Sequence, residues 1–212
     1  MTHNVVYSHE SLHRYLEDLS DRSIVPGGGS AAAVAASVGA ALNLMVIKYS
    51  IKEGPAADEK NDIIVLRARQ SEGLNRLRAA IDRDCEVFSE LMRSLSSGGD
   101  TQKKYIQAAE VPMEICRECC AALKITVFLS ENSNRNLITD VGCAANILEA
   151  AFSSAALNVL VNLKNIKDGE FVRAAEDALT RMTEEMKEEV RGITRRVAEG
   201  LATDKAPGVS EQ

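Results

Sequence analysis

The sequence has no tryptophan and, in 212 residues, only four tyrosines, four phenylalanines and four prolines. Aromatic residues make up 4% of a chain that is 45% apolar, so its core must be built from Ala, Val, Leu, Ile and Met. Such a core suits closely packed helices, and scarce proline suits long ones. No segment alternates like a strand. We therefore predict one all-α domain over residues 1–212, a bundle of five or six mostly long antiparallel helices.

The chain also lacks an excess of positive charge. Its net charge of −6 disfavours nucleic acid or an anionic membrane surface as a partner. The first residues, MTHNVVYSHESLH, lack the basic and apolar regions of a signal peptide. Residues 30–47 are rich in Ala, Gly and Ser, and we expect them to be too weakly hydrophobic for a membrane span. A cytoplasmic protein with no nucleic-acid and no membrane partner is expected.

The cysteine and histidine residues do not form a convincing metal site. The five cysteines are odd in number, and the Cys116-x-x-Cys119-Cys120 spacing has neither a nearby His nor a second Cys pair. We expect them to pack as small apolar residues. His9 and His13 could share a helix face, but exposed histidines are the more common case. No metal is expected.

Helical periodicity predicts segments over residues 8–21, 30–51, 58–94, 101–129, 139–164 and 168–199, with a frayed tail at 203–212. Ser8, Asp58 and Asp168 are the expected N-caps of three of these helices, and Pro112 is expected to kink the fourth. The second and fifth segments are rich in small residues, which allow a neighbouring helix to come close. They pack either on each other or on a second copy of the chain.

Pro26-Gly27-Gly28-Gly29-Ser30 stands where the second helix begins. Three glycines permit positive φ and the close approach of a ligand to the backbone. The free N–H groups and the dipole of a helix N-terminus favour a negative or electron-rich group. The alternative is a glycine-rich turn with Ser30 as the N-cap. The P-loop lysine is missing and no strand precedes the turn, so nucleotide binding is disfavoured.

Several motifs follow one another along residues 8–170. They are Leu12-x-x-Tyr15-Leu16-x-x-Leu19; PGGGSAAA at 26–33, continuing to Ala40-Ala41-Leu42-x-x-Met45-Val46; Asp84-x-x-x-Phe88; Ala108-x-x-Val111-Pro112; and Asn134-x-Asn136-x-x-Thr139-Asp140-x-Gly142-x-Ala144-Ala145, continuing to Ala155-x-x-Asn158-Val159-x-Val161-Asn162. In this combination they resemble the formiminotetrahydrofolate cyclodeaminase/methenyltetrahydrofolate cyclohydrolase family. Two departures are a stretch at 48–54 that is only partly basic, where the family is often Lys-rich, and Thr139 in place of a serine.

The resemblance implies an all-α homodimer that acts on one-carbon-substituted tetrahydrofolates. One activity of the family closes 5-formiminotetrahydrofolate to the 5,10-methenyl form with loss of ammonia. The other adds water to 5,10-methenyltetrahydrofolate to give 10-formyltetrahydrofolate. No cofactor is expected beyond the tetrahydrofolate substrate. The alternative is a non-catalytic helical module that binds folate or a protein partner through the same groove.

Both reactions pass through a positively charged carbon bonded to two nitrogens. A carboxylate beside that carbon can stabilise the charge or accept a proton. The resemblance makes Asp84 and Asp140 the candidate catalytic residues. Asp84 would suit proton transfer if burial raises its pKa, and its alternative is an exposed position on a helix surface. Asp140 lies at a predicted helix start, so N-capping is its alternative.

The candidate substrate-binding residues are Pro26, Gly27, Gly28, Gly29, Ser30, Lys48, Asn158 and Asn162. Asn158 and Asn162 are one helical turn apart among apolar neighbours, where buried amides need partners. They either read the amide-like edge of the pterin or tie helices together. Lys48 and Lys52 either meet the carboxylates of a glutamate tail or form a solvated face.

Overall fold

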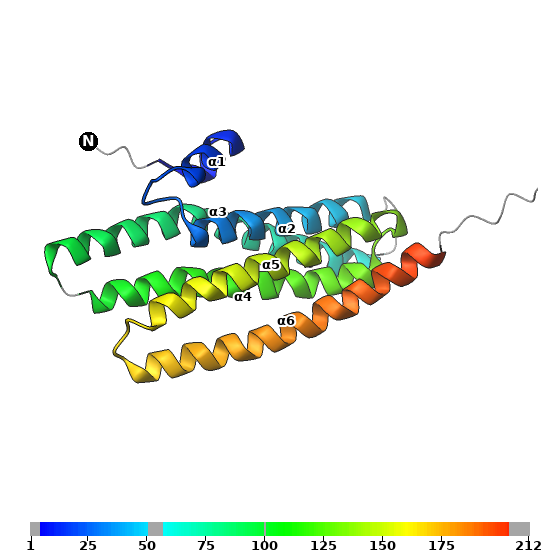
Figure 1. Cartoon of the computed structure of the whole chain (residues 1–212). Helices are drawn as coiled ribbons and strands as arrows, with labels where there is room; N and C mark the ends of the chain where they lie inside the picture. Colours follow the sequence, from blue (N-terminus) through cyan, green and yellow to red (C-terminus); the bar gives the residue numbers. More distant parts are fainter. Residues whose placement is uncertain (1–4, 51–56, 100, 204–212) are drawn as a thin grey trace, which may run out of the picture.

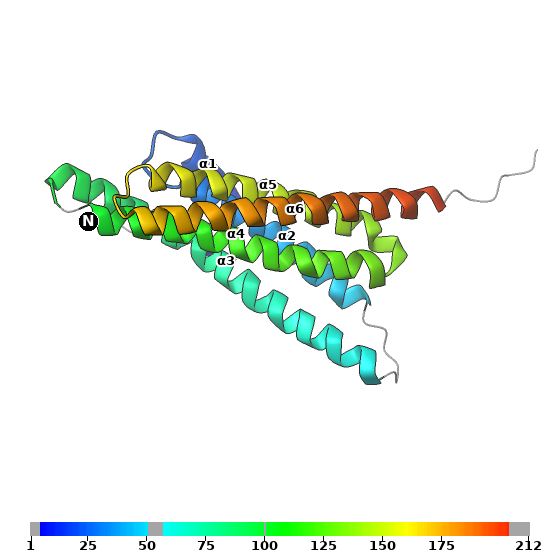
Figure 2. The same ribbon diagram turned by 90° about the horizontal axis from the view of Figure 1, so that it is seen from below.

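The computed structural model describes residues 5–50, 57–99 and 101–203, which form a bundle of long helices (Figures 1 and 2). In chain order its elements are η1 (Tyr7–His9), α1 (Leu12–Ser20), α2 (Gly28–Ser50), α3 (Ala57–Ser97), α4 (Gln102–Asn132), η2 (Arg135–Leu137), α5 (Ile138–Leu163) and α6 (Gly169–Thr203). No strand occurs in these ranges, so the all-α prediction is confirmed. The tail at 204–212 lies outside the described residues.

The long helices α2 to α6 make up the body of the bundle. Helices α2, α3 and α4 pack against one another, and α5 packs against α2, α4 and α6. The short helix α1 lies outside this body (Figure 1), and the beginning of α3 diverges from the other helices (Figure 2). In the part described, chain direction alternates from α2 to α5, so the start of α2 and the end of α5 share one end of the bundle.

The two helices rich in small residues, α2 and α5, pack directly on each other. A Cβ added at Gly39 would lie 2.8 Å from Cγ of Leu148 and 3.3 Å from the carbonyl oxygen of Ala144. Only a residue without a side chain fits this contact between the helix backbones. The first of the two packing alternatives is therefore the one found within this chain.

Helix α2 and the segment Arg135–Leu163 are long and apolar enough to cross a membrane by length and composition alone. The expectation that residues 30–47 are too weakly hydrophobic for a span is therefore wrong on that measure. Within the bundle, 56% of the apolar window of α2 and 39% of that of Arg135–Leu163 is buried. Core helices of bundles pass the same test, and the expectation of no membrane partner stays a prediction.

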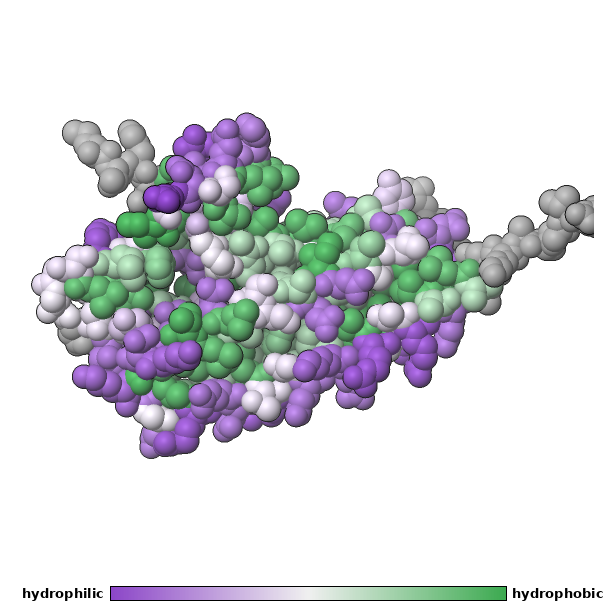
Figure 3. Space-filling model, in the orientation of Figure 1, coloured by the Kyte–Doolittle hydropathy of each residue, from purple (hydrophilic) through white to green (hydrophobic). Residues whose placement is uncertain are grey.

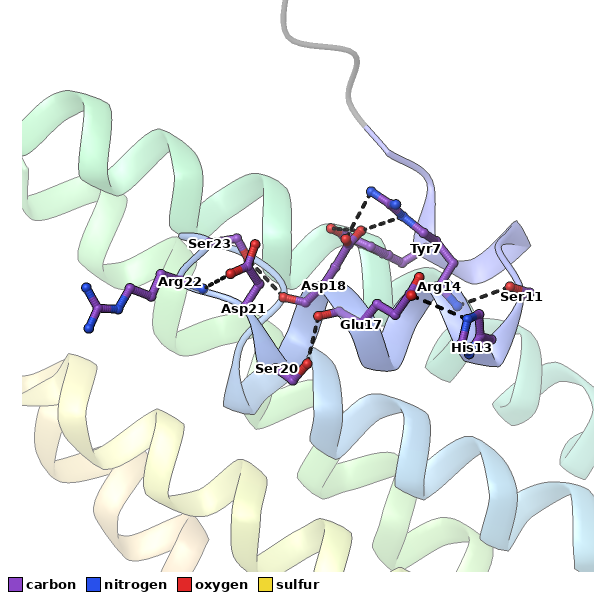
Figure 4. Close-up of polar contacts among 10 residues, drawn as sticks. All are labelled: Tyr7, Ser11, His13, Arg14, Glu17, Asp18, Ser20, Asp21, Arg22 and Ser23. Atoms are coloured by element: carbon purple, nitrogen blue, oxygen red, sulfur yellow. Dashed lines mark hydrogen bonds and ion pairs between the residues drawn. The ribbon is translucent and has the colours of Figure 1, made fainter.

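Several helix boundaries differ from those predicted. Helix α1 begins at Leu12, and its N-cap is Ser11, whose hydroxyl accepts the Arg14 N–H at 3.1 Å (Figure 4). The predicted cap, Ser8, lies instead in the 3-10 turn η1. Helix α3 begins at Ala57, so Asp58 is already helical.

At two other helix starts, the residue before the helix differs in whether its side chain caps the helix. Asp168 caps α6 as predicted, because its Oδ1 accepts the N–H groups of Glu170 at 3.0 Å and Phe171 at 3.1 Å. Thr101 precedes α4 but makes no side-chain cap bond. Helix α4 continues without interruption through Pro112 to Asn132.

All five cysteines are free thiols, and three of them, Cys85, Cys116 and Cys119, are buried as packing residues. Cys143 is exposed on α5, contrary to that expectation. Among the residues that the structure describes, no group of three or more His, Cys, Asp or Glu side chains could hold a metal ion.

Candidate functional site

The glycine-rich turn opens α2 two residues earlier than predicted. The helix begins at Gly28, and the Ala31 N–H already bonds to the carbonyl of Gly27 at 2.9 Å. Ser30 is therefore a fully buried residue inside the first turn and is not the N-cap. The Val25–Pro26 peptide bond before the turn is cis.

Gly29, and to a lesser extent Gly28, are needed for space. Gly98 is the one glycine with positive φ in the described part of the chain, so Gly27 to Gly29 do not use the positive φ that glycine permits. A Cβ at Gly29 would lie 2.1 Å from Oδ1 of Asp84, and one at Gly28 would lie 3.3 Å from Nδ2 of Asn158. The turn thus makes room for polar side chains from α3 and α5.

Asp84 reaches the first turn of α2 from the second half of α3. Its Oδ2 accepts the Ser30 N–H at 2.8 Å, one of the N–H groups that a helix start leaves without an internal partner. Burial raises the pKa of Asp84 to about 6, and the bond from the Ser30 N–H acts in the opposite direction. The carboxyl is half-buried, so the alternative of an ordinary exposed aspartate does not hold. A carboxyl with this pKa suits proton transfer near neutral pH.

Tyr15 of α1 joins this cluster, although sequence reasoning placed it only on an apolar stripe and in a family motif. Its side chain is 4% exposed, and its hydroxyl donates to Oγ of Ser30 at 3.1 Å. The Cys85 thiol lies against the same serine hydroxyl, and burial raises the pKa of Cys85 to about 11. The signal available in the sequence was a tyrosine, with a polar hydroxyl, on the apolar stripe of this helix; in the structure it is the buried residue of α1.

Asn158 brings α5 to the same turn. Its amide nitrogen donates to the carbonyl of Ser154 at 2.9 Å and lies beside the Cα of Gly28. The side chain is half-buried, so its amide lies at the edge of the cluster. The structure therefore gathers Gly28, Gly29, Ser30, Asp84 and Asn158 in one place.

Asn162, one turn further along α5, ties two helices together. Its amide nitrogen donates to the carbonyl of Ala108 on α4 at 2.9 Å and to the carbonyl of Asn158 at 2.8 Å. Pro112, four residues after Ala108, has no N–H to give to that carbonyl. Asn162 replaces the missing donor, which supports the second of its two alternatives. Its role in substrate binding stays a prediction.

Two other predicted site residues lie at the opposite end of the bundle. Asp140 is in the first turn of α5, 18 residues before Asn158, or about 27 Å along the helix. Lys48 is exposed on α2, 20 residues after Gly28, or about 30 Å away. Within one chain neither residue joins the Asp84 cluster. Lys52 lies outside the described residues.

The alternative reading of Asp140 as an N-cap is wrong, because helix α5 begins at Ile138 and Leu137 holds the cap position. Asp140 is the third helical residue, where a carboxylate still interacts favourably with the helix dipole. Its predicted catalytic role is not supported by the Asp84 cluster of the same chain.

An open groove of about 1820 Å³ runs along α3 next to the cluster. Its walls include Ile24, Val25 and Cys85, together with charged side chains of α3 such as Arg78 and Glu86. Asp84 and the glycines do not line it, but Val25 and Cys85 directly precede and follow candidate site residues. The groove therefore meets the cluster on the side of Cys85, whose thiol lies against the Ser30 hydroxyl.

Known proteins are similar to this chain in both sequence and fold. The sequence model of a family described as formiminotransferase-cyclodeaminase matches residues 11–181. The chain belongs to the formiminotransferase-cyclodeaminase family. A methenyltetrahydrofolate cyclohydrolase of Methylorubrum extorquens is 32% identical over 174 residues, which are 76% of this chain and 83% of the relative.

Other members of the formiminotransferase-cyclodeaminase family extend the comparison. The formimidoyltransferase-cyclodeaminase of Gallus gallus is 30% identical over 190 residues, 84% of this chain, but the match spans only 35% of that longer protein. The crystal structure of formiminotetrahydrofolate cyclodeaminase from Thermotoga maritima superposes with a TM-score of 0.78 at 27% identity. That match covers 93% of this chain and 98% of the Thermotoga chain.

Proposed function

We propose that this chain hydrolyses 5,10-methenyltetrahydrofolate to 10-formyltetrahydrofolate. The comparisons support a folate one-carbon enzyme, and the relative from Methylorubrum extorquens named for this hydrolysis aligns over 83% of its length. The observation that carries the proposal is the Asp84 carboxylate. It is held against the first turn of α2 by the Ser30 N–H at 2.8 Å, and its pKa of about 6 suits a base.

In the proposed reaction, water attacks the cationic carbon between N5 and N10 of the pterin. Asp84 stabilises the cation and accepts one proton of that water as the C–O bond forms. The C–N5 bond then breaks, and Asp84 returns its proton to N5. The remaining hydroxyl proton passes to solvent as the carbonyl forms, which leaves a formyl group on N10.

The neighbouring residues supply binding and orientation in this scheme. The backbone of Gly27 and Gly28 offers a surface without side chains, so a flat ring can approach it closely. Asn158 lies beside Gly28 and is half-buried, so its amide can meet the polar edge of the ring. Pro26 fixes the chain just before this surface.

The cyclising deamination of 5-formiminotetrahydrofolate is the second candidate, favoured by the match to the Thermotoga cyclodeaminase over 98% of that chain. Here N10 attacks the carbon of the protonated formimino group, whose nitrogen becomes an NH2 group, and Asp84 accepts the N10 proton as the ring closes. That proton then goes to the departing nitrogen, which leaves as ammonia. The same carboxylate at the same carbon serves both reactions.

A homodimer is part of the proposal. The outward face of α2 and α5 carries Leu42, Tyr49, Leu157 and Val161, of which Tyr49 and Leu157 are 70% and 68% exposed. Hydrophobic surface gathers over these two helices in Figure 3. An exposed apolar face of this kind is typical of a subunit interface. Leu157→Glu is expected to give a monomer by light scattering, whereas Leu201→Glu on α6 is not.

The experiment that tests the proposed function supplies both folates to the purified chain and follows the absorbance of the methenyl group. Wild type is expected to remove the methenyl band from one substrate or create it from the other. Asp84→Asn is expected to lose at least about 100-fold in rate, whereas Asp177→Asn on the exposed face of α6 keeps it. Tight folate binding by calorimetry without turnover would instead indicate a non-catalytic module. A cytoplasmic location and the lack of a further cofactor stay predictions.

A further inference from the structure

Behind Asp84 lies a buried pair of hydroxyl groups that the proposed reaction does not use directly. Ser30 is 0% exposed and Tyr15 is 4% exposed. The Tyr15 hydroxyl donates to Oγ of Ser30 at 3.1 Å, and the backbone N–H of Ser30 donates to Oδ2 of Asp84 at 2.8 Å. One serine thus connects a tyrosine of α1 to the carboxylate on α3.

Ser30 is the first residue at the start of α2 whose side chain can hold the turn in place. Gly28 and Gly29 form the start of α2 and have no side chains with which to fix its orientation. Ser30 is the first residue of the helix that can be held from the side. The position of its N–H, and so of the Asp84 carboxylate, depends on what holds the serine hydroxyl.

Comparing Tyr15 with its neighbour Tyr7 separates the contribution of the aromatic ring from that of the hydroxyl. The two rings meet edge to face, with centroids 5.6 Å apart and an angle of 87° between the planes. The Tyr7 hydroxyl donates to Oδ2 of Asp18 at 3.2 Å, a contact within the N-terminal segment that Figure 4 shows together with the Arg14–Asp18 pair. Both rings serve packing, but the Tyr15 hydroxyl is the one bonded to the serine beside Asp84.

We propose that Tyr15 is a positioning residue for the reaction, which holds the Ser30 hydroxyl and thereby fixes the backbone N–H that orients Asp84. This inference rests on the proposed function, in which Asp84 is the base. Tyr15 itself does not touch the reacting atoms in this scheme. Its effect passes through Ser30.

The groups around Asp84 give the sign of the expected effect. The titratable groups that face the cluster are Tyr15 from α1 and Asp82 and Cys85 from α3. Helix α2 contributes the Ser30 N–H and α5 the neutral amide of Asn158. A looser Ser30 weakens the one bond that lowers the pKa of Asp84, so that pKa should rise.

From α4, Glu114 faces the neighbouring Arg83 of α3, and the two form an ion pair. Their opposite charges offset each other. The pair is the same in every variant described below, so it does not change the expected direction of the shift in the Asp84 pKa.

The test compares Tyr15→Phe with the control Tyr7→Phe, since each keeps its ring and loses one hydroxyl. For Tyr15→Phe we expect kcat to fall about tenfold with KM within about twofold, and the acid limb of the pH–rate profile to move to higher pH. Tyr7→Phe should retain the wild-type rate and profile. Ser30→Ala should reproduce the Tyr15→Phe shift, and the double variant should add nothing further.

A titration that does not need activity keeps this inference separate from the proposed function. The carboxyl carbon of Asp84, assigned by its loss in Asp84→Asn, is followed by NMR from about pH 4 to about pH 8, a range that brackets the expected midpoint. Its midpoint should rise in Tyr15→Phe but not in Tyr7→Phe. An unchanged midpoint, or equal changes in both variants, would overturn the inference. An inactive wild type with a shifted midpoint would sink only the proposed function.

Discussion

Gly29→Ala is expected to inactivate the enzyme through a single clash. The added methyl carbon would lie 2.1 Å from Oδ1 and 2.8 Å from Oδ2 of Asp84. Carbon and oxygen atoms that are not bonded need more than about 3 Å, so the carboxylate must move by about 1 Å. That movement breaks the 2.8 Å bond from the Ser30 N–H.

The size of the effect follows from the two consequences of this movement. A misplacement of about 1 Å in a catalytic group costs about 100-fold in rate. The lost bond to a charged acceptor contributes about 1.5–3 kcal/mol, which is about tenfold or more. We therefore expect kcat to fall by at least about 100-fold.

A graded series of alanine variants makes the prediction specific. An added Cβ meets no atom within 4 Å at Gly27, lies 3.3 Å from Nδ2 of Asn158 at Gly28, and is 2.1 Å from the carboxylate at Gly29. The loss of kcat should increase in that order. Gly192→Ala, in α6 far from the site, controls for placing alanine in a helix.

The assay is steady-state turnover of the folate substrate, with thermal melting followed by circular dichroism for each variant. Gly29→Ala should stay folded, because only one carboxylate has to give way. Equal kcat values for Gly27→Ala and Gly29→Ala would refute the reasoning, since the clash would then have no catalytic consequence.

Two further predictions concern stability. Burial raises the pKa of Asp84 from 3.8 to about 6. The contribution of Asp84 to stability is therefore present below pH 3.8 and is lost as the pH rises through about 6. In urea denaturation across pH, Asp84→Asn should remove this pH dependence and, above the folded pKa, raise the unfolding free energy by up to about 3 kcal/mol. Asn162→Ala should cost about 1–2 kcal/mol by leaving the Ala108 carbonyl without its donor. In a Pro112→Ala background the cost of Asn162→Ala should fall, because the introduced alanine restores the missing N–H. An unchanged cost in this double-mutant cycle would show that the Asn162–Ala108 bond does not compensate for the proline.

The bundle could be predicted because no segment alternates like a strand; α6 has a clear apolar side, whereas α2 and α5 are apolar around most of their surface. Boundaries failed where a polar residue was given a cap role by its type alone. Ser30 has the chemistry of an N-cap, yet its hydroxyl is bonded to Tyr15 of another helix. Ser11, one residue before α1, was the cap in place of Ser8.

The purpose of the glycines could not be predicted from the turn itself. Glycine permits both positive φ and close approach, and only the register of α3 against α2 decides between them. That register places Asp84, from the second half of the next helix, against Gly29. Tertiary packing sets it, and no local pattern encodes it.

The separation of the predicted site residues, by contrast, follows from the alternating directions of the helices. In an antiparallel bundle the start of the second helix meets the end of the fifth, which brings Gly28 to Asn158. The same rule places Lys48 and Asp140 together at the other end, where the Asn134 N–H bonds to the hydroxyl of Ser50 at 3.3 Å. Family motifs gathered these residues into one set, but the helix order divides them.

The most direct test of Asp84 as the base is the pH dependence of kcat/KM for 5,10-methenyltetrahydrofolate, with the uncatalysed rate subtracted at each pH. Wild type should show an acid limb with a midpoint near the Asp84 pKa of about 6. Asp84→Asn should lose that limb together with at least about 100-fold of the rate. A variant that keeps both the wild-type rate and the acid limb would contradict the account.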